Sequence, residues 1–340
     1  MIRDAIARLI NGEDLDRAQA EATMDDIMNG DATESQIAGL LVALRLKGET
    51  VDEIVGLVSS MRSHARTLTA PDGAVDTCGT GGDGAGTFNI STAAAIVVRG
   101  AGAPVAKHGN RSSSSLCGSA DVLEALGVPM SLTADQVQAC LDATGICFML
   151  APTFHPAMRH AGVPRKDLGI RTVFNILGPL ANPAMVRRQS LGVASAQMAP
   201  LMASVLKELG HERALVFCGS DGLDELSVAA PSRVWELRDG EIREYDIDGA
   251  SLGLAVAQPG DLKGGDAAAN AVILNAILDG ETGSRRDVVL LNAAAALVAA
   301  GAADDLPQGI EKARASIDSG AARQALADLR DTAQSLASAP

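Results

Sequence analysis

The feature that most constrains this chain is a glycine-rich stretch at residues 75–92, with the sequence VDTCGTGGDGAGTFNIST. Five of its glycines lie within eight consecutive residues, so the backbone can adopt positive φ and approach a ligand with no Cβ in the way. An apolar run at residues 93–98 follows and predicts a helix. A glycine loop that leads into a helix N-terminus favours an anion, most often phosphate. The alternative is an ordinary turn-rich loop in which Asn89 or Ser91 caps the helix.

A second polar stretch, KHGNRSSSS at residues 107–115, follows the predicted helix. Its two cations, four hydroxyls and one amide could neutralise and hydrogen-bond several phosphate oxygens. A flexible serine-rich linker is the alternative, although such linkers seldom carry cations or join two apolar segments. The glycine loop has neither the Rossmann spacing nor a Walker lysine. The two stretches together therefore predict a polyphosphorylated ligand that is not a plain nucleotide.

The composition argues against several classes of protein. Hydrophobic residues make up 47% of the chain but aromatic residues only 2%, so the core must use small aliphatic side chains, which suit packed helices and a buried parallel sheet. The net charge of −14 argues against a general affinity for nucleic acid or an anionic membrane. Five cysteines without a CxxC pair indicate reduced thiols, and we expect Cys78 to be a small buried residue. With no secretory pattern and no unbroken apolar run, we expect a cytoplasmic protein.

The chain divides into a helical part and an α/β part. Residues 2–66 predict helices only, including one with Ile2, Ile6, Leu9 and Ile10 on a single face. Capping-box patterns mark two further helix starts, at Thr33/Gln36 and Thr50/Glu53. We therefore expect an α/β fold. It has a small all-helical N-terminal lobe at residues 1–70 and a large α/β domain at residues 71–340, with a central mostly parallel sheet flanked by helices.

The individual elements of the α/β part follow from its apolar runs. The expected strands cover residues 74–77, 103–106, 147–150, 189–194, 214–218, 234–237 and 241–246. The last two should form a hairpin around Asp239-Gly240. Helices are expected at residues 91–99, 121–126 and 200–209. Three Ala-rich helices are expected after Gly264-Gly265, and we interpret them as scaffold.

Two adjacent carboxylates, Asp224 and Glu225, follow the strand expected at residues 214–218. Carboxylate oxygens in such a place are the hard ligands that Mg²⁺ prefers when it also bridges to phosphates. The alternative is a solvated turn, which is where most Asp-Glu pairs are found. A basic stretch between residues 153 and 183 has a similar alternative, a helix with a solvated cationic face.

Taken together, the motifs resemble those of the anthranilate phosphoribosyltransferases of tryptophan biosynthesis. The resemblance rests on four stretches in the right order: GTGGD at 79–83, the segment 107–115, RTVFNILGPLANP at 171–183 and GLDEL at 222–226. It covers nearly the whole chain. It implies an enzyme that transfers phosphoribose from phosphoribosyl pyrophosphate to the amino group of anthranilate and releases pyrophosphate, with Mg²⁺ as cofactor.

The resemblance also implies roles for individual residues. Anthranilate is expected against Gly79, Asn110 and Arg165, because a planar guanidinium suits a carboxylate, with His155 and Arg159 on the same side. No general base is assigned, since an aromatic amine is already unprotonated at neutral pH, and His108 is expected to line the substrate. Mg²⁺ is expected on Ser91, Asp224 and Glu225. The residues expected at phosphoribosyl pyrophosphate are Gly79, Gly82, Asp83, Thr87, Asn89, Ile90, Ser91, Thr92, Lys107, His108, Gly109, Asn110, Arg111, Ser112, Ser113, Ser114, Ser115 and Ser119.

The remaining expectations concern partners and rival functions. The resemblance implies a homodimer formed through the helical lobe, and packing of residues 155–185 onto that lobe, which leaves the site between the lobes. It also implies an association with the anthranilate synthase system. No nucleic acid and no membrane is expected as a partner. Two rivals stay open: a pyrimidine nucleoside phosphorylase of related fold, and a non-catalytic relative that binds nucleic acid.

Overall fold

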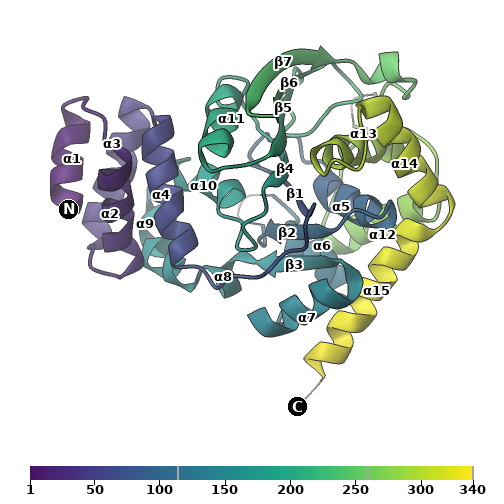
Figure 1. Cartoon of the computed structure of the whole chain (residues 1–340), viewed down its shortest axis with the longest axis horizontal. Helices are drawn as coiled ribbons and strands as arrows, with labels where there is room; N and C mark the ends of the chain where they lie inside the picture. The colour runs from purple at the N-terminus through teal and green to yellow at the C-terminus, as the bar shows by residue number, and fades with distance from the viewer. Residues whose placement is uncertain (113–114, 259, 339–340) are drawn as a thin grey trace.

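The computed structural model describes residues 1–112, 115–258 and 260–338. Within these ranges the centre of the large domain is a seven-stranded sheet of order β3-β2-β1-β4-β5-β6-β7 (Figure 1). Strands β1 to β5 are parallel, and β6 and β7 add an antiparallel edge. This confirms the expected α/β fold with a mostly parallel sheet. The strands are β1 (Val75–Gly79), β2 (Val105–Gly109), β3 (Ile146–Leu150), β4 (Arg188–Gly192), β5 (Arg213–Gly219), β6 (Ser232–Arg238) and β7 (Glu241–Ile247).

The N-terminal lobe is helical, as expected, and lies at the left of Figure 1. Both predicted capping boxes form, at the starts of α3 and α4. One detail of the first helix was wrong: Ile10 is 69% exposed. Leu9 continues the buried stripe of Ile2 and Ala5, and the next residue lies about 100° further round a helix of 3.6 residues per turn. The lobe comprises α1 (Ile2–Ile10), α2 (Arg17–Met28), α3 (Glu34–Lys47) and α4 (Val51–Ser63).

A segment from the middle of the chain packs back onto this lobe. Its helices are α8 (Ala151–Phe154), η1 (Pro156–Ala161), α9 (Gly162–Leu168) and α10 (Phe174–Leu180). Helix α9 contacts α3, η1 contacts α2, and α10 contacts α4. The sheet edge, the lobe and this segment are therefore brought together in space.

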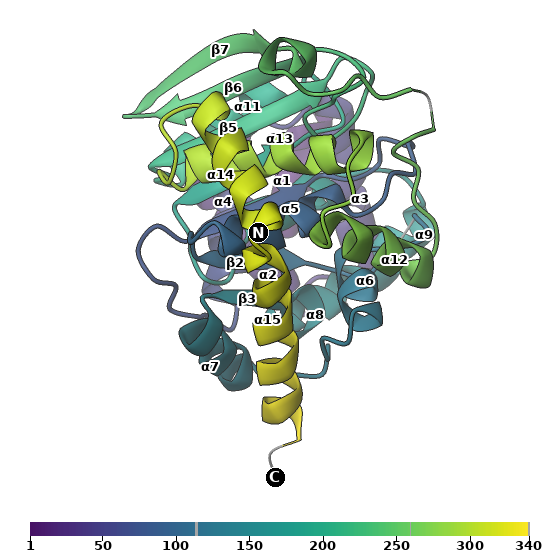
Figure 2. The same ribbon diagram turned by 90° about the vertical axis from the view of Figure 1, so that its right-hand side faces the viewer.

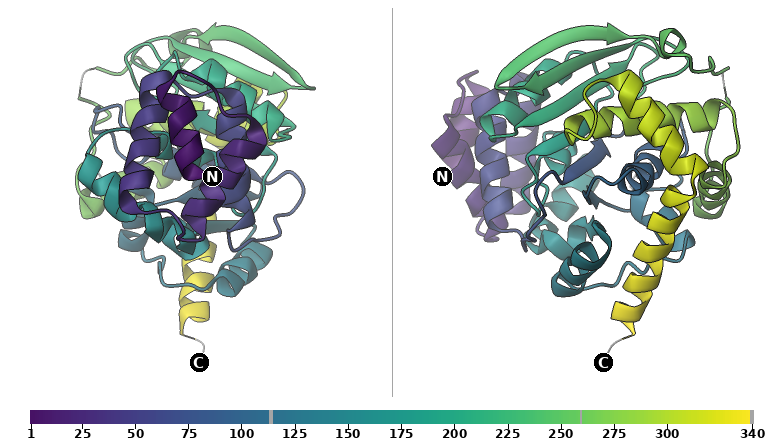
Figure 3. Two further views of the ribbon diagram at one scale, coloured as in Figure 1. Left: turned by 90° about the vertical axis from the view of Figure 1, so that its left-hand side faces the viewer. Right: turned by 45° about the vertical axis from the view of Figure 1, so that its right-hand side comes forward.

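Side chains of the central strands point alternately into two hydrophobic cores, one on each face of the sheet. In β5, Leu215 and Phe217 belong to a core with α5 (Ile90–Gly100) and the C-terminal helices. Val216 and Cys218, on the opposite face of β5, belong to a core with the lobe, α10 and α11 (Ala199–Glu208). The two sides are seen in Figure 3, with the lobe in front on the left. Because period-2 alternation sends neighbours to opposite faces, the sheet is covered on both.

The C-terminal helices cover the other face of the sheet (Figure 2). Four helices lie within the described residues 266–338, so the expected number of three was wrong. Gly301 and Gly320 interrupt this region with positive φ of 70° and 79°. Small residues permit close packing here: a Cβ at Gly309 would lie 2.9 Å from the Ala294 Cα. The helices are α12 (Ala267–Leu278), α13 (Ser284–Ala299), α14 (Leu306–Asp318) and α15 (Ala321–Ala337).

The remaining elements agree with the expectations within a few residues. Strand β2 runs on to Gly109, so Lys107 lies inside the strand and not after it. The β6–β7 hairpin turns at Asp239 and Gly240, with φ of 54° and 77°, as a two-residue primed turn requires. Helices α6 (Ser119–Ala125) and α7 (Ala134–Thr144) lie between β2 and β3. None of the helices described is both long and apolar enough to cross a membrane.

Candidate active site

The glycine-rich loop joins β1 to α5 at the carboxyl edge of the sheet. A Cβ at Gly79 would collide with the Asp224 carboxylate, and a Cβ at Gly82 would collide with the Arg171 guanidinium. The loop therefore lies directly against side chains from distant parts of the chain. Four of its glycines have positive φ between 64° and 81°, namely Gly81, Gly82, Gly84 and Gly86.

The N-terminus of α5 is held without a capping side chain. Asn89 occupies the N-cap position but makes no capping hydrogen bond, and Ser91 lies inside the helix, so the cap that the alternative of a turn-rich loop includes does not form. The Ser91 N–H donates to Glu225 Oε1 at 3.1 Å, and Thr77 Oγ1 donates to the Ser91 carbonyl at 3.0 Å. The Thr92 hydroxyl is buried without a partner in the described part of the chain. The Thr92 hydroxyl is therefore the group at this helix start that can bond to a ligand such as a phosphate.

Asp224 and Glu225 lie against the loop and are mostly buried. Asp224 Oδ2 accepts a hydrogen bond from the Gly81 N–H at 2.6 Å. Burial raises the pKa of Asp224 to about 6, and the Asp83 carboxylate beside it adds to the shift. Burial also raises the pKa of Glu225 well above its usual value. Three carboxylates in so small a space are costly unless a cation joins them.

The carboxylate oxygens of Asp83, Asp224 and Glu225 fit a Mg²⁺ ion that is held jointly with a substrate. Asp224 and Glu225 offer hard oxygens, and Asp83 Oδ2 is buried with no hydrogen-bond partner among the described residues. In those same residues, no three His, Cys, Asp or Glu side chains are arranged to hold a metal by themselves. Mg²⁺ commonly takes one or two protein carboxylates and completes its shell with water and substrate phosphates. An ion here would therefore be completed by the ligand.

A buried polar network lies beneath the loop. Lys107 is 3% exposed, and its ammonium donates to the Thr77 carbonyl. Asp76 is fully buried, which raises the pKa of its carboxyl to about 6. Its oxygens accept from Asn182 Nδ2 at 2.7 Å and from the His108 N–H at 3.2 Å. The network joins β1 and β2 to the segment that follows α10.

A cavity of about 460 Å³ opens next to this network, between the sheet edge and the segment 151–179. Such a volume suits a small ligand. Arg165 lies at the cavity with its guanidinium carbon 5.2 Å from the centroid of the Phe174 ring. Seven of the residues expected at a substrate line this cavity: Gly79, His108, Gly109, Asn110, His155, Arg159 and Arg165.

Two histidines line the cavity as neutral rings. The ring centroids of His108 and His155 are 5.1 Å apart, with the planes tilted by 56°. Burial lowers the pKa of His108 to about 3 and also lowers the pKa of His155. His108 Nδ1 lies 3.2 Å from the Gly178 carbonyl. Because only an N–H can bond to a carbonyl, Nε2 is the unprotonated nitrogen.

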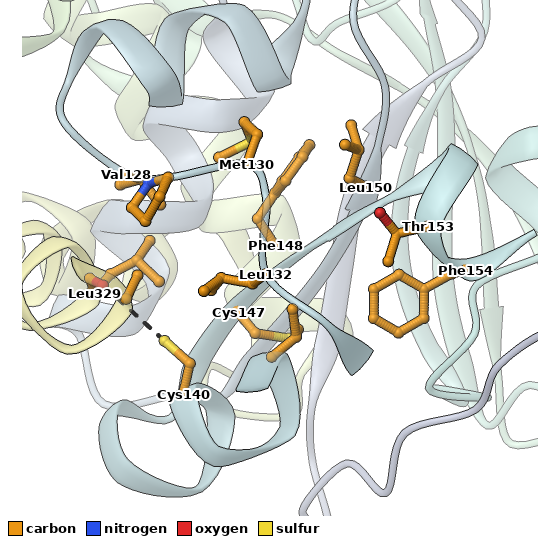
Figure 4. A pocket seen from close by; sticks show the side chains of 13 residues that line it. Val128, Met130, Leu132, Cys140, Cys147, Phe148, Leu150, Thr153, Phe154 and Leu329 are labelled. Atoms are coloured by element: carbon orange, nitrogen blue, oxygen red, sulfur yellow. Dashed lines mark hydrogen bonds between the residues drawn. The ribbon is translucent and has the colours of Figure 1, made fainter. Parts of the chain in front are cut away.

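A second cavity, of about 20 Å³, lies under β3 between α7 and α15 (Figure 4). Apolar side chains such as Leu132, Phe148 and Leu329 surround it, and Cys140 Sγ lies 4.0 Å from the Leu329 carbonyl. This volume is close to that of a single water. The small cavity is therefore a packing defect of the core and not a substrate site.

Comparison with known proteins decides the family. The profile of the glycosyl transferase family helical bundle domain matches residues 3–65, and that of the family's a/b domain matches residues 71–323. Anthranilate phosphoribosyltransferase from Afipia carboxidovorans is 53% identical over 95% of this chain and 96% of that protein. The protein of the same name from Roseiflexus sp. is 55% identical over 94% of this chain and 95% of that protein. The chain belongs to the anthranilate phosphoribosyltransferase family.

Solved structures of this family have the same fold. The anthranilate phosphoribosyltransferase of Thermus thermophilus superposes with a TM-score of 0.93 at 41% identity, over 97% of this chain and 99% of that one. The Saccharomyces cerevisiae enzyme in complex with PRPP and Mg gives a TM-score of 0.90 at 28% identity, over 98% of both chains. A further structure of the yeast enzyme holds 4-fluoroanthranilate, with a TM-score of 0.88 at 27% identity and the same coverage.

Most residues that the family resemblance selected lie on three adjoining segments: the glycine loop, the start of α5 and the end of β2. Others are placed differently. Ile90 is 1% exposed and packs in the core, so its side chain does not face a ligand. Thr87 forms an isolated bridge with Lys263. Cys78 is buried, as expected, and accepts a hydrogen bond from Gln189 Nε2 at 3.0 Å.

The serine-rich segment is tied to α6 in this structure. Arg111 is exposed, and its guanidinium pairs with Asp121 at 2.9 Å and with Glu124 at 2.7 Å. The Ser112 N–H donates to Asp121 at 3.0 Å, and Ser115 Oγ lies 2.8 Å from Ser112 Oγ. Ser119 is the first residue of α6. Ser113 and Ser114 lie outside the described residues.

Four residues at or beside the site had no role assigned from the sequence. Arg171 and Asn182 lie within the quoted stretch 171–183, but nothing in the pattern says what they touch. Asp76 carried a signal, since a carboxylate in the middle of an apolar strand needs a partner. Asn270 lies in an Ala-rich helix, where one amide does not stand out.

Proposed function

We propose that the glycine loop side of this site binds phosphoribosyl pyrophosphate and that the cavity binds anthranilate. The chain is a phosphoribosyltransferase that moves the phosphoribosyl group to the amino group of anthranilate. The products are N-(5-phosphoribosyl)anthranilate and pyrophosphate, and the reaction is the second step of tryptophan biosynthesis from chorismate. The observation that carries the placement is Gly79. It lines the cavity and also lies in contact with Asp224, so acceptor and donor would meet across one residue that has no side chain.

The glycine loop side, called the donor side because it would hold the phosphoribosyl donor, offers the groups that a diphosphate needs. The loop glycines let main-chain N–H groups approach phosphate oxygens, and the macrodipole of α5 favours negative charge at its start. Asp224 and Glu225, with Ser91, would hold Mg²⁺ against the phosphates. When bound, Mg²⁺ supplies Lewis-acid stabilisation of the departing pyrophosphate. In the relative from Saccharomyces cerevisiae, PRPP and Mg were found together.

The acceptor side offers a cation and neutral polar groups. The Arg165 guanidinium would pair with the anthranilate carboxylate through two parallel N–H donors. Asn110 and Gly79 line the same cavity. With a pKa near 3, His108 is not an acid at neutral pH, and the aromatic amine needs no strong base because it is already unprotonated. We therefore give His108 a substrate-lining role, and acceleration comes from orientation and electrostatics.

The same proposal extends to the roles of the two lobes, the oligomeric state and the cellular location. Residues 1–70, with about 155–185 packed against them, would form the dimerisation and acceptor side, and residues 71–340 the donor side. Met1, Ile10 and Leu46 are 59%, 69% and 82% exposed in the lobe, and these apolar side chains support a homodimer formed there. We further propose a cytoplasmic location and an association with the anthranilate synthase system, which co-elution of the two enzymes would test.

A fluorescence assay tests the proposed function. Purified protein is mixed with anthranilate and phosphoribosyl pyrophosphate, with Mg²⁺ or with excess EDTA. Anthranilate should disappear with one pyrophosphate formed per molecule consumed, and only when Mg²⁺ is present. Phosphate-dependent release of thymine from thymidine would instead favour the nucleoside phosphorylase, and a gel shift with nucleic acid at physiological salt would favour the non-catalytic relative.

A further inference from the structure

Asn270 is a buried amide that links the C-terminal helices to the donor side of the site. It lies in the first turns of α12 and is 1% exposed. Its Nδ2 donates to Asn89 Oδ1 at 2.9 Å, across 181 residues of sequence. Its Oδ1 accepts from the Gly265 N–H at 2.8 Å. A buried amide with partners on both sides has a fixed orientation.

Two main-chain groups, the Gly265 N–H and the Cys117 carbonyl, determine how the side-chain amides of Asn270 and Asn89 are oriented. A main-chain N–H can only donate, so the group of Asn270 that faces Gly265 must be its oxygen. The opposite group, Nδ2, therefore faces Asn89 and requires the oxygen of Asn89. At the other end, Asn89 Nδ2 lies 3.2 Å from the Cys117 carbonyl, which can only accept. The Gly265 N–H and the Cys117 carbonyl therefore favour the same arrangement, in which Asn270 Nδ2 faces Asn89 Oδ1 and Asn89 Nδ2 faces Cys117.

This orientation of the Asn89 amide decides which of its groups can bond to a ligand. Its oxygen already accepts from Asn270 Nδ2 at 2.9 Å and from Cys117 Sγ at 3.3 Å. Its Nδ2 carries two hydrogens, and one of them is directed to the Cys117 carbonyl. Asn89 makes no capping bond to α5. Among the described residues, one N–H of Asn89 is therefore left without a partner, and an anionic oxygen can accept a hydrogen bond from it.

The local backbone is built to keep Asn270 in place. A Cβ at Gly264 would lie 2.6 Å from Asn270 Oδ1 and 2.7 Å from the Phe88 main chain, so this close approach needs a glycine. The Gly264 N–H donates to the Gly86 carbonyl at 3.0 Å. The Phe88 N–H donates to the Leu262 carbonyl at 3.1 Å. The far end of the glycine loop is thereby joined to the start of α12.

We propose that Asn270 is a positioning residue for the donor substrate, acting through Asn89. It holds the Asn89 amide so that an N–H, and not the oxygen, faces the phosphoribosyl pyrophosphate. This inference rests on the proposed donor site at the start of α5. It gives the C-terminal helices a part in substrate binding that extends beyond covering the sheet.

A double-mutant cycle tests the inference, with steady-state KM for phosphoribosyl pyrophosphate and for anthranilate measured on each protein. Asn89→Ala should raise the donor KM roughly 10-fold or more, the expected loss of a hydrogen bond to a charged group. Asn270→Ala should raise it roughly 5-fold, with the anthranilate KM nearly unchanged, because an Asn89 amide held only through Cys117 still donates part of the time. In the double variant the donor KM should match that of Asn89→Ala within about two-fold if Asn270 acts through Asn89 alone.

A second variant separates orientation from stability. Asn270→Asp keeps the shape and the bond from Gly265 but has no N–H for Asn89. The carboxylate would then face the Asn89 oxygen without a hydrogen bond, and only the Cys117 carbonyl would still hold the Asn89 amide. The donor KM should therefore rise at least as much as in Asn270→Ala. Asn275→Ala, on the same helix with its oxygen bonded to Arg323, is the matched control and should leave the donor KM unchanged.

Each other result overturns a stated part of the inference. If the rise in donor KM of the double variant equals the product of the rises in Asn89→Ala and Asn270→Ala, Asn270 does not act through Asn89. Equal rises in donor and anthranilate KM would make Asn270 a general structural residue. No change of donor KM in Asn89→Ala would remove Asn89 from the donor site and the inference with it. The Mg²⁺-dependent consumption of anthranilate would still test the proposed function independently.

Discussion

The Asp224 carboxylate accepts a hydrogen bond from the Gly81 main-chain N–H at 2.6 Å, across 143 residues of sequence. Glu225 makes the matching contact with the N–H of Ser91 at 3.1 Å. The two carboxylates that would hold Mg²⁺ are therefore already docked on the loop and the helix start that would hold the phosphates. The proposed donor side is thus built from β1, α5 and the loop after β5, whose contacts hold its groups in place, as electrostatic stabilisation requires.

Arg165→Ala should raise the KM for anthranilate far more than the KM for phosphoribosyl pyrophosphate. Arg165 lies at the cavity over Phe174, and its guanidinium would serve the acceptor carboxylate. Loss of such a contact costs about 1.5–3 kcal/mol, or roughly 10- to 150-fold in KM. Steady-state kinetics with each substrate varied in turn measures the difference.

The control for Arg165 is Lys166→Ala, which removes a neighbouring cation on α9. Lys166 is exposed and does not line the cavity, so both KM values should stay near those of the unchanged protein. Equal effects of Arg165→Ala on both substrates would place Arg165 in a shared structural role and remove it from the acceptor site.

Asp76 should make the fold less stable as the pH rises from about 4 to about 6. Burial raises the pKa of Asp76 from 3.8 to about 6 in the folded protein, so the fold keeps a proton that the unfolded chain has released in this interval. Its contribution is fully present below the unfolded pKa and is lost as the pH rises through the folded pKa. A shift of about two units corresponds to about 3 kcal/mol of unfolding free energy.

The measurement for Asp76 is denaturant unfolding of the unchanged protein and of Asp76→Asn at pH 4 and pH 7. The difference in unfolding free energy between the two proteins should change by about 3 kcal/mol in favour of the variant at the higher pH. Asn182→Ala should move the transition to higher pH, because its hydrogen bond lowers the pKa of Asp76. A pH-independent difference would show that Asp76 is not held in the buried state described.

The helical lobe should form the contact of a homodimer. Leu46, at the end of α3, is 82% exposed, and a charge at a buried apolar contact is strongly unfavourable. Light scattering at micromolar concentration should give twice the mass of the 34.7 kDa chain and a monomer for Leu46→Glu. Val272→Glu is the control, since Val272 is 68% exposed on α12, outside the lobe. A monomeric unchanged protein, or a Leu46→Glu dimer, would contradict the proposed interface.

Local patterns in the sequence predicted much of this fold. Thr33/Gln36 and Thr50/Glu53 start helices because a capping box depends on four consecutive residues. Asp239-Gly240 predicted a turn because few residues accept two successive positive φ values. The wrong number of C-terminal helices has the opposite cause. Alanine favours helix everywhere, so composition does not show where one helix ends and the next begins.

The candidate site could be proposed from the sequence where one segment holds several of its groups and not where distant segments meet. The glycine loop and Asp224-Glu225 could be proposed because their chemistry is concentrated in a few residues. The contact of Arg171 with Gly82 and that of Asn270 with Asn89 depend on tertiary packing, which no local pattern encodes. The pairing of Arg111 with Asp121 and Glu124 is likewise a property of how α6 returns to the end of β2.

The double change Asp224→Asn with Glu225→Gln tests whether these carboxylates serve Mg²⁺ and the donor. It keeps the side-chain shapes and removes two buried charges that repel each other, so the melting temperature should be unchanged or slightly higher. The control is Asp221→Asn in the same loop. Asp221 accepts from Ser227 Oγ at 2.6 Å and from the Leu223 N–H at 3.3 Å, so this change should lower the melting temperature but leave turnover per folded molecule nearly intact.

The most direct measurement is turnover of anthranilate by the double variant with saturating phosphoribosyl pyrophosphate and Mg²⁺, taken beside a thermal melt of the same preparation. Turnover should fall at least ~10²-fold, because stabilisation of the leaving group through the metal is worth several kcal/mol. Additional Mg²⁺ should restore little of it, since neutral amides replace hard anionic ligands poorly. Near-normal turnover in a folded double variant would contradict the metal assignment and the donor site built on it.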